Sequence, residues 1–231
     1  MRPLRKLEVW LARRLRARPA GERPEPLWPP VLAVLVILSL QLTLAENLSV
    51  GPNWLAPALE FALLVPLTVS AWTHTARESA PRRALNILLI ALVNVFNLLS
   101  LALLIRELLG GRASNGTLLL FNAVKLWFTN VLCFALWYWE IDRGGPWRRR
   151  LKVARHPDFL FAQMSTPEVA EPHWVPDFWD YLFVSFTNAA AFSPTDTLPL
   201  TGRAKMLMMT QAFISLVTVA LVASRAVNIL K

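Results

Sequence analysis

Apolar residues in this chain gather into long blocks with almost no charge, instead of recurring at the spacing of a soluble amphipathic helix or strand. Such blocks predict transmembrane helices, because about 20 mainly apolar residues are needed to cross ~30 Å of hydrocarbon. Backbone N–H and C=O groups in lipid must pair within their own segment, which makes helix the expected state. Five blocks approach that length: residues 28–45, 55–72, 84–105, 117–139 and 206–224.

The composition agrees with a membrane protein. Of the 231 residues, 55% are hydrophobic, which excludes a disordered chain. The single cysteine, Cys133, excludes a disulfide framework and a cysteine-based zinc site. A cleaved signal peptide at the first block is disfavoured, because a long charged leader precedes it and the apolar run exceeds the usual length of about 7–15 residues.

Basic residues are concentrated on one side of the predicted membrane. With five crossings, 19 of the 24 Lys and Arg residues fall in the N-terminus and in the loops on its side. The positive-inside rule therefore places the N-terminus in the cytoplasm of a plasma or inner membrane. Leu4, Leu7, Leu11 and Leu15 recur at helical spacing among arginines, which predicts a basic amphipathic helix on anionic lipid headgroups; a solvated topogenic tail is the alternative. Because the charges flank membrane spans, nucleic acid is not an expected partner.

The pattern divides the chain into three regions. Residues 1–27 form the basic leader, and residues 28–116 form a membrane region of three helices. Residues 117–231 hold the last two blocks. Between those blocks, residues 140–178 contain charges of both signs and five prolines, which predicts an extramembrane loop of mostly irregular structure.

The stretch 180–229 has the layout of a re-entrant pore loop. It opens with the apolar run DYLFVSFTNAA, which is too short to span, continues with the polar AFSPTDTLPLTGRAK and ends in the last block. Non-helical backbone at membrane depth is allowed only where protein or water surrounds it. The sequence therefore predicts an all-α polytopic membrane protein with five transmembrane helices plus a re-entrant pore helix and loop.

The same stretch resembles the pore module of tetrameric potassium channels, which consists of pore helix, selectivity filter and inner helix. The resemblance covers about fifty residues without gaps. It is carried by 180–187 (D-x-L-Y-F-S-F in the family), Asp196 after the filter, Pro199, Thr201 and Ala204 (P-x-T-x-x-A), 211–215 (E-A-L-I-G) and 220–227. The resemblance implies a homotetramer, an outer helix at 117–139 and a turret at 140–178.

The filter itself departs from the family pattern. Where the family has T-V-G-Y-G, this chain has Ala191, Phe192, Ser193, Pro194 and Thr195. A potassium filter offers rings of backbone carbonyls, and its glycines permit backbone angles that other residues avoid. Thr is β-branched and resists positive φ, and proline fixes its own φ and extends the residue before it. A standard potassium filter is therefore not expected.

The altered loop suggests two functions. Four copies of Ser193, Thr195 and Asp196 around an axis would form rings of hydroxyls and carboxylates, and acidic rings favour cations. The first hypothesis is therefore an ion-channel-like protein that passes monovalent cations with weak selectivity, with Gln211, Ser215 and Thr218 lining the path. The second is a non-conducting membrane scaffold or sensor, in which the loop is only a turn and Asp196 or Thr201 caps the last helix.

Two indications disagree about which side of the membrane the pore mouth faces. Known potassium channels place the filter outside the cell, whereas the charge count places the 140–178 side inside. We follow the charge count, because the leader alone carries eight basic residues.

Polar residues inside the blocks are few. Glu60 and Lys125 are the only charged ones. They pair with each other, or they reach an interface; we favour an interface for Glu60 and leave Lys125 open. Asn94 and Asn97 are expected to join helices to one another. No catalytic constellation or Gly-rich phosphate loop is recognisable, so neither an enzyme nor a cofactor is expected.

Overall fold

The computed structural model describes residues 25–49, 51–52, 54–73, 80–109, 116–150, 156–168, 170–171, 174–190 and 197–229. The predicted leader lies outside the described residues, except for its last three positions, 25–27. The same holds for the predicted filter, residues 191–196.

The described chain is mostly helical, as the sequence predicts, and every apolar block contains a helix. These helices are α2 (Trp28–Leu42), α3 (Leu55–Thr73), α4 (Ala80–Leu109), α5 (Gly116–Ile141) and α9 (Gly202–Ile229). Several ends differ from the blocks. Helix α4 begins four residues ahead of its block and ends four residues beyond it, and α9 ends five residues beyond its block. Helix α2 has 15 residues and stops before Thr43, and α9 begins four residues ahead of the predicted block.

Within the described residues, three segments are long and apolar enough to cross a membrane: Pro81–Leu109, Gly116–Gly144 and Gly202–Ser224. The apolar stretches Trp28–Leu42 and Leu55–Val65 are shorter. The prediction of a mostly helical protein is confirmed, and these three helices are consistent with an integral membrane protein. That all five blocks cross the membrane, with a re-entrant pore helix and loop, stays a prediction.

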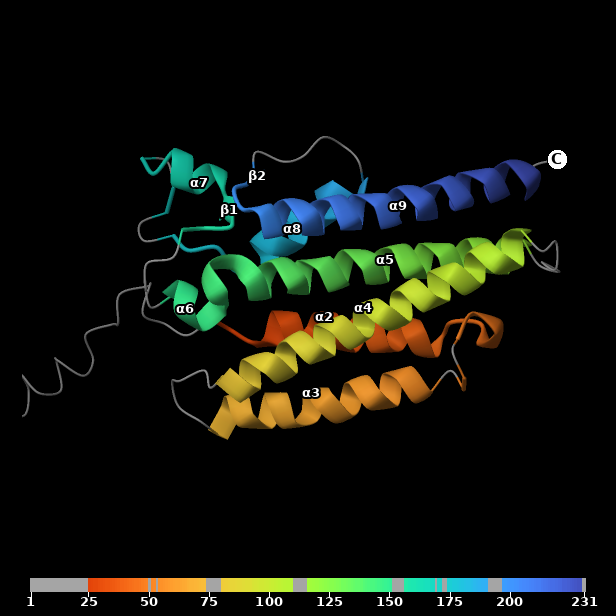
Figure 1. Cartoon of the computed structure of the whole chain (residues 1–231), viewed down its shortest axis with the longest axis horizontal. Helices are drawn as coiled ribbons and strands as arrows, with labels where there is room; N and C mark the ends of the chain where they lie inside the picture. Colours follow the sequence, from red (N-terminus) through yellow and green to blue (C-terminus); the bar gives the residue numbers. More distant parts are fainter. Residues whose placement is uncertain are drawn as a thin grey trace, which may run out of the picture.

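Helix α5 occupies the middle of the bundle (Figure 1). It packs against α2 and α4 on one side, and α9 runs along its other side. Helix α3 contacts α2 and α4, at the edge of the bundle away from α9. The largest fully buried side chains include Tyr138 and Phe134 of α5, and Ile37 of α2. Because α5 contributes to both sides, its residues are more completely covered than those of α9.

The segment after α5 contains several short elements where the sequence predicted mostly irregular structure. These are η3 (Asp142–Gly144), α6 (Pro146–Arg150), β1 (Phe159–Leu160) and α7 (Ala162–Ser165). Strand β1 pairs antiparallel with β2 (Leu198–Pro199), with Phe159 opposite Pro199. This pairing brings the segment against the beginning of α9.

Helix α9 starts where the sequence places a cap. The Oγ1 of Thr201 accepts a hydrogen bond from the N–H of Ala204 at 3.3 Å, which is the N-cap arrangement. Of the two capping residues considered from the sequence, Thr201 is therefore confirmed, and Asp196 lies outside the described residues.

Candidate functional site: a half-length helix between α5 and α9

Helix α8 (Phe178–Ala190) is too short to cross a bilayer. Its 13 residues extend about 20 Å at 1.5 Å per residue, against ~30 Å of hydrocarbon. One face of the helix is buried, with members three or four positions apart: Phe178, Tyr181, Val184, Ser185 and Ala189. The other face exposes Trp179, Phe183 and Phe186. The buried face lies against α5 and α9.

A fully buried amide on α9 joins all three helices. The Nε2 of Gln211 donates to the backbone carbonyl of Ser185 at 2.9 Å and to its Oγ at 2.7 Å. The Oε1 of Gln211 accepts from the Tyr138 hydroxyl of α5 and from the Asn188 amide of α8, the latter at 2.8 Å. Both donors and both acceptor positions of this amide are therefore occupied.

Further hydrogen bonds attach α8 along its length. The Oγ of Ser185 donates to the Val131 carbonyl on α5 at 2.6 Å. Near the end of α8, the Ser215 hydroxyl of α9 donates to the Ala189 carbonyl and accepts from the Trp127 indole N–H at 2.8 Å. Satisfied polar groups of this kind fix one arrangement of neighbouring helices, because each displacement would leave a buried group without a partner.

Helices α8 and α9 run in the same direction. Ser185 meets Gln211 and Ala189 meets Ser215, and both pairs are separated by 26 residues in sequence. The end of α8 therefore lies level with Ser215, about 20 Å along α9 from its first residue at 1.5 Å per residue. Strand β2, which follows in the described chain, lies at the beginning of α9.

A cluster of charged and hydroxyl side chains, here called the collar (Asp142, Arg143, Asp158, Thr201 and Arg203), lies where α5 ends and α9 begins. The Asp158 carboxylate is fully buried and accepts from Arg203 Nε and from a terminal nitrogen of Arg203, both at 2.6 Å. It also accepts from the Thr201 hydroxyl at 2.6 Å and from the Arg143 N–H at 3.0 Å. The two-point arginine contact fixes orientation as well as distance.

The collar also holds the first turns of α8. The Tyr181 hydroxyl donates to Asp142 Oδ2 at 2.6 Å, and the Asp158 N–H donates to Asp142 Oδ1 at 2.7 Å. Beside it, Arg149 forms an ion pair with Glu25 at 3.1 Å, with both side chains almost completely buried. The Arg149 guanidinium lies 4.9 Å from the centre of the Tyr181 ring. The collar and this pair therefore connect α5, α8, α9 and the residues ahead of α2.

Burial by itself would raise the pKa of Asp158. The hydrogen bonds from Arg203, from Thr201 and from the Arg143 amide outweigh it, so the pKa of this carboxyl lies below its ordinary value. Asp158 is therefore ionised at neutral pH and holds Arg203 as an ion pair.

The predicted site residues fall into two groups. Ala191, Phe192, Ser193, Pro194, Thr195 and Asp196 lie outside the described residues, so their role stays a prediction. Gln211, Ser215 and Thr218 are at most 1% exposed in the single chain, and the first two bond to α8. The Thr218 hydroxyl donates to the Ile214 carbonyl of its own helix at 2.8 Å. Pore lining by these three also stays a prediction.

Sequence reasoning missed most of the partners in this site. Tyr138, Ser185 and Asn188 carried one weak signal, because polar residues within apolar helices usually face other helices. Asp158 carried none, since a lone acid in a proline-rich stretch reads as a solvated loop residue. Among the described residues no cluster of three or more His, Cys, Asp or Glu is placed to hold a metal ion.

Comparison of the chain with protein-family models, with curated proteins and with solved structures found no match.

Proposed function

We propose that this chain is the subunit of an ion-channel-like integral membrane protein that passes monovalent cations with weak selectivity. The observation that carries the proposal is the placement of α8. It is a half-length apolar helix, bonded between two span-length helices, and it ends about halfway along α9 while the chain resumes at the beginning of α9.

In this proposal α8 is a re-entrant pore helix, and α2, α3, α4, α5 and α9 cross the membrane. The N-terminus is cytoplasmic, on the side of the collar, and the basic leader rests on anionic lipid. The chain between Ala190 and Leu198 joins two points that lie at different depths along α9. That return path is what a pore loop requires, and its polar groups need protein or water around them.

The proposal includes an assembly around an axis. Helices α8 and α9 together expose a set of large apolar side chains: Trp179, Phe183, Phe186, Met206, Met209, Phe213, Leu216 and Val219. Lipid alone would cover these side chains but would offer no hydrogen-bond partners to a re-entrant loop that follows α8. A homotetramer covers both, and it brings four copies of Asp196 to one axis.

The hydrogen bonds of the site bear on how such a channel would open. Gln211, Ser215 and Thr218 are covered within the subunit, so they would line a path only after α9 rotates relative to α8. The same observation favours the second candidate function, a non-conducting scaffold or sensor that uses the pore-like packing only as a rigid framework.

Cation flux into liposomes separates the two functions. We expect the purified protein to admit monovalent cations into sealed vesicles, and we expect Asp196→Asn to reduce the rate several-fold. Glu46→Gln serves as the control, because Glu46 is an exposed residue on η2 (Glu46–Leu48). Vesicles that stay impermeable at every cation composition, with correctly folded protein, would favour the scaffold.

A further inference from the structure

A second buried polar site lies away from α8, among α2, α3, α4 and α5. Glu60 of α3 is fully buried, and its Oε1 accepts a hydrogen bond from Gln41 Nε2 of α2 at 3.1 Å. Its other oxygen, Oε2, has no hydrogen-bond partner. The Oε1 of Gln41 has no partner either. The two residues are therefore joined by one hydrogen bond while each keeps one unpaired acceptor oxygen.

A single proton on Glu60 would give both oxygens a partner. A neutral carboxylic acid carries one O–H donor beside its carbonyl oxygen. With the proton on Oε2, Glu60 can donate to Gln41 Oε1 while Gln41 Nε2 continues to donate to Glu60 Oε1. An ionised Glu60 would instead hold a full charge at membrane depth with one amide N–H for compensation, which is costly.

No charged neighbour offers a different explanation. The ionisable groups on the helices around Glu60 are Arg82, Arg83, Arg106 and Glu107 on α4, and Lys125, Cys133, Tyr138 and Glu140 on α5. No ion pair joins Glu60 to any of them within the described residues. Lys125, which the sequence offered as a partner, donates to the Thr43 carbonyl at the end of α2 at 2.5 Å.

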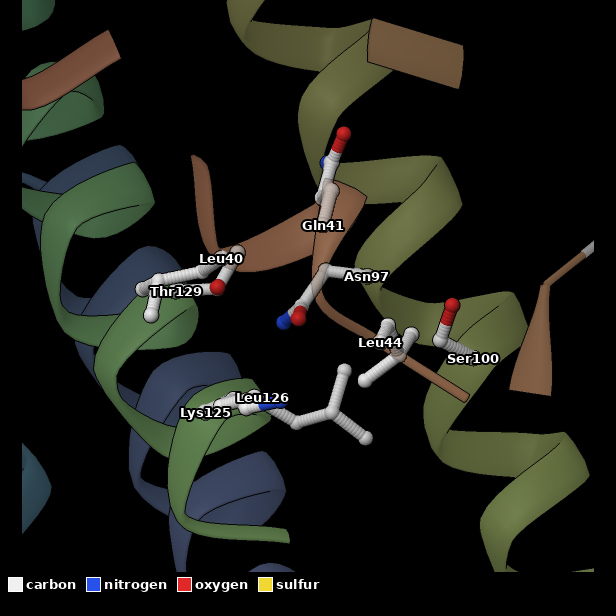
Figure 2. A pocket seen from close by; sticks show the side chains of 8 residues that line it. All are labelled: Leu40, Gln41, Leu44, Asn97, Ser100, Lys125, Leu126 and Thr129. Atoms are coloured by element: carbon white, nitrogen blue, oxygen red, sulfur yellow. The ribbon is translucent and has the colours of Figure 1, made fainter. Parts of the chain in front are cut away.

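A small cavity lies on the other side of Gln41. It is lined by Leu40, Gln41, Leu44, Asn97, Ser100, Lys125, Leu126 and Thr129, and about 10 Å³ is open to the centre of a water molecule. That is room for about one water. Asn97 is 5% exposed, and its Oδ1 has no partner. Figure 2 shows the Asn97 amide pointing into the space toward Thr129 and α5, whereas the Gln41 amide points away from it.

These groups suit a water molecule that connects to solvent. A water in the cavity can donate to Asn97 Oδ1 and accept from the Lys125 ammonium, which has two N–H donors beyond the one given to Thr43. Lys125 is only partly buried, so the water has a polar route past it. Gln41 lies between this water and Glu60, so the water reaches the acid only when the Gln41 side chain moves aside.

We propose that Glu60 is a proton-binding site inside the α2–α5 bundle, and that a water held between Asn97 and Lys125 is the carrier by which its proton exchanges with solvent. On release, the O–H bond at Oε2 breaks, its electron pair stays on the carboxylate, and the proton passes to water. The polar side chains of the site belong to α2, α3, α4 and α5 alone, so the proposal does not depend on whether residues 191–196 conduct.

Infrared difference spectroscopy on the full-length protein in lipid at neutral pH tests the proposal. Subtracting the spectrum of Glu60→Gln from that of the wild type should isolate the carbonyl stretch of a protonated acid, and the band should shift in heavy water. Glu140→Gln is the matched control: Glu140 is equally buried but lies 3.2 Å from the Arg83 guanidinium, so its removal should subtract carboxylate bands only.

Two further variants keep Glu60 itself in place. Gln41→Leu should move the acid band to higher frequency, because the carbonyl loses its donor. Asn97→Leu, which fills the cavity, should slow the heavy-water shift several-fold, and Ser39→Ala on the exposed side of α2 should not. Three results would each overturn the proposal. They are carboxylate bands in place of the acid band, band positions that differ between sodium and potassium buffers, and an exchange rate that Asn97→Leu does not change.

Discussion

Two parts of this helix bundle differ in how their buried polar side chains are hydrogen-bonded. Around α8, the side chains of Gln211, Ser185 and Ser215 all have partners on neighbouring helices. Between α2, α3 and α4, by contrast, one oxygen each of Gln41, Glu60 and Asn97 has none. The first arrangement fixes one geometry, and the second leaves positions that a proton and a water can occupy.

This difference distinguishes a rigid part of the molecule from a part that can bind and release a proton and a water. The collar holds one end of the α5–α8–α9 unit, and the hydrogen bonds of Gln211, Ser185 and Ser215 hold it further along α8. Loss of any partner there leaves a buried group unpaired. Glu60 and Gln41 already contain unpaired atoms. Substitutions there should therefore change the binding of a proton and a water more than they change the stability of the fold.

The largest effect is expected in the collar. Asp158→Ala removes a buried carboxylate and leaves Arg203, Thr201 and the Arg143 amide without their acceptor. We expect the free energy of unfolding to fall by about 3 kcal/mol, because a hydrogen bond to a charged group is worth about 1.5–3 kcal/mol and several are lost, while the half-exposed Arg203 regains part of its loss from water. Thermal unfolding in detergent measures this, and Glu46→Ala is the exposed control. A loss no larger than that of the control would show that the collar does not hold the helix ends.

A smaller loss is expected from Gln211→Leu. The substitution keeps the volume but leaves the Tyr138 hydroxyl and the Ser185 carbonyl without this partner. We expect a loss of about 2 kcal/mol, since buried hydrogen bonds between membrane helices are worth about 1–2 kcal/mol and several are lost. Thr210→Val, one residue away on the exposed side of α9, is the matched control. Equal stability of the two variants would contradict the claim that the hydrogen bonds of Gln211 hold α5, α8 and α9 together.

Acid should weaken the collar without a mutation, and by less than Asp158→Ala because the side chain remains. The pKa of Asp158 is lowered in the folded protein, so its contribution is complete above the ordinary aspartate value of about 3.9. It is lost as pH falls through the lower, folded value. The Tm difference between wild type and Asp158→Asn should therefore shrink below about pH 4. A difference that stays constant down to the lowest pH at which the protein folds would contradict this.

The smallest effect is expected from Thr218→Val. The Thr218 hydroxyl bonds only within α9, to the Ile214 carbonyl, and contributes nothing to the attachment of α8. We expect a change in Tm equivalent to about 0.5 kcal/mol or less, because valine has nearly the same shape and the carbonyl keeps its helical partner. A loss as large as that of Gln211→Leu would show that Thr218 also holds α8 against α9, which the contacts do not indicate.

The sequence predicts the helices well and their contacts poorly. Long apolar blocks predict helix because backbone groups in lipid have no other partners, and this applies equally to α4, α5 and α9. The contacts are different in kind. Asp158 meets Arg203 across 45 residues, and Gln211 meets Tyr138 across 73, and no local pattern encodes either pairing. The sequence identified Gln211 and Ser215 as polar positions on the last helix, but their burial against α8 depends on how α8 is placed.

The most direct test of the channel-like proposal is a density map of the protein purified in detergent. We expect four copies around an axis, with the carboxyl ends of α8 turned toward that axis. The exposed apolar side chains of α8 and α9, among them Phe183 and Phe213, should be covered by the neighbouring subunit. A solitary subunit, or α8 facing the detergent, would contradict the proposal.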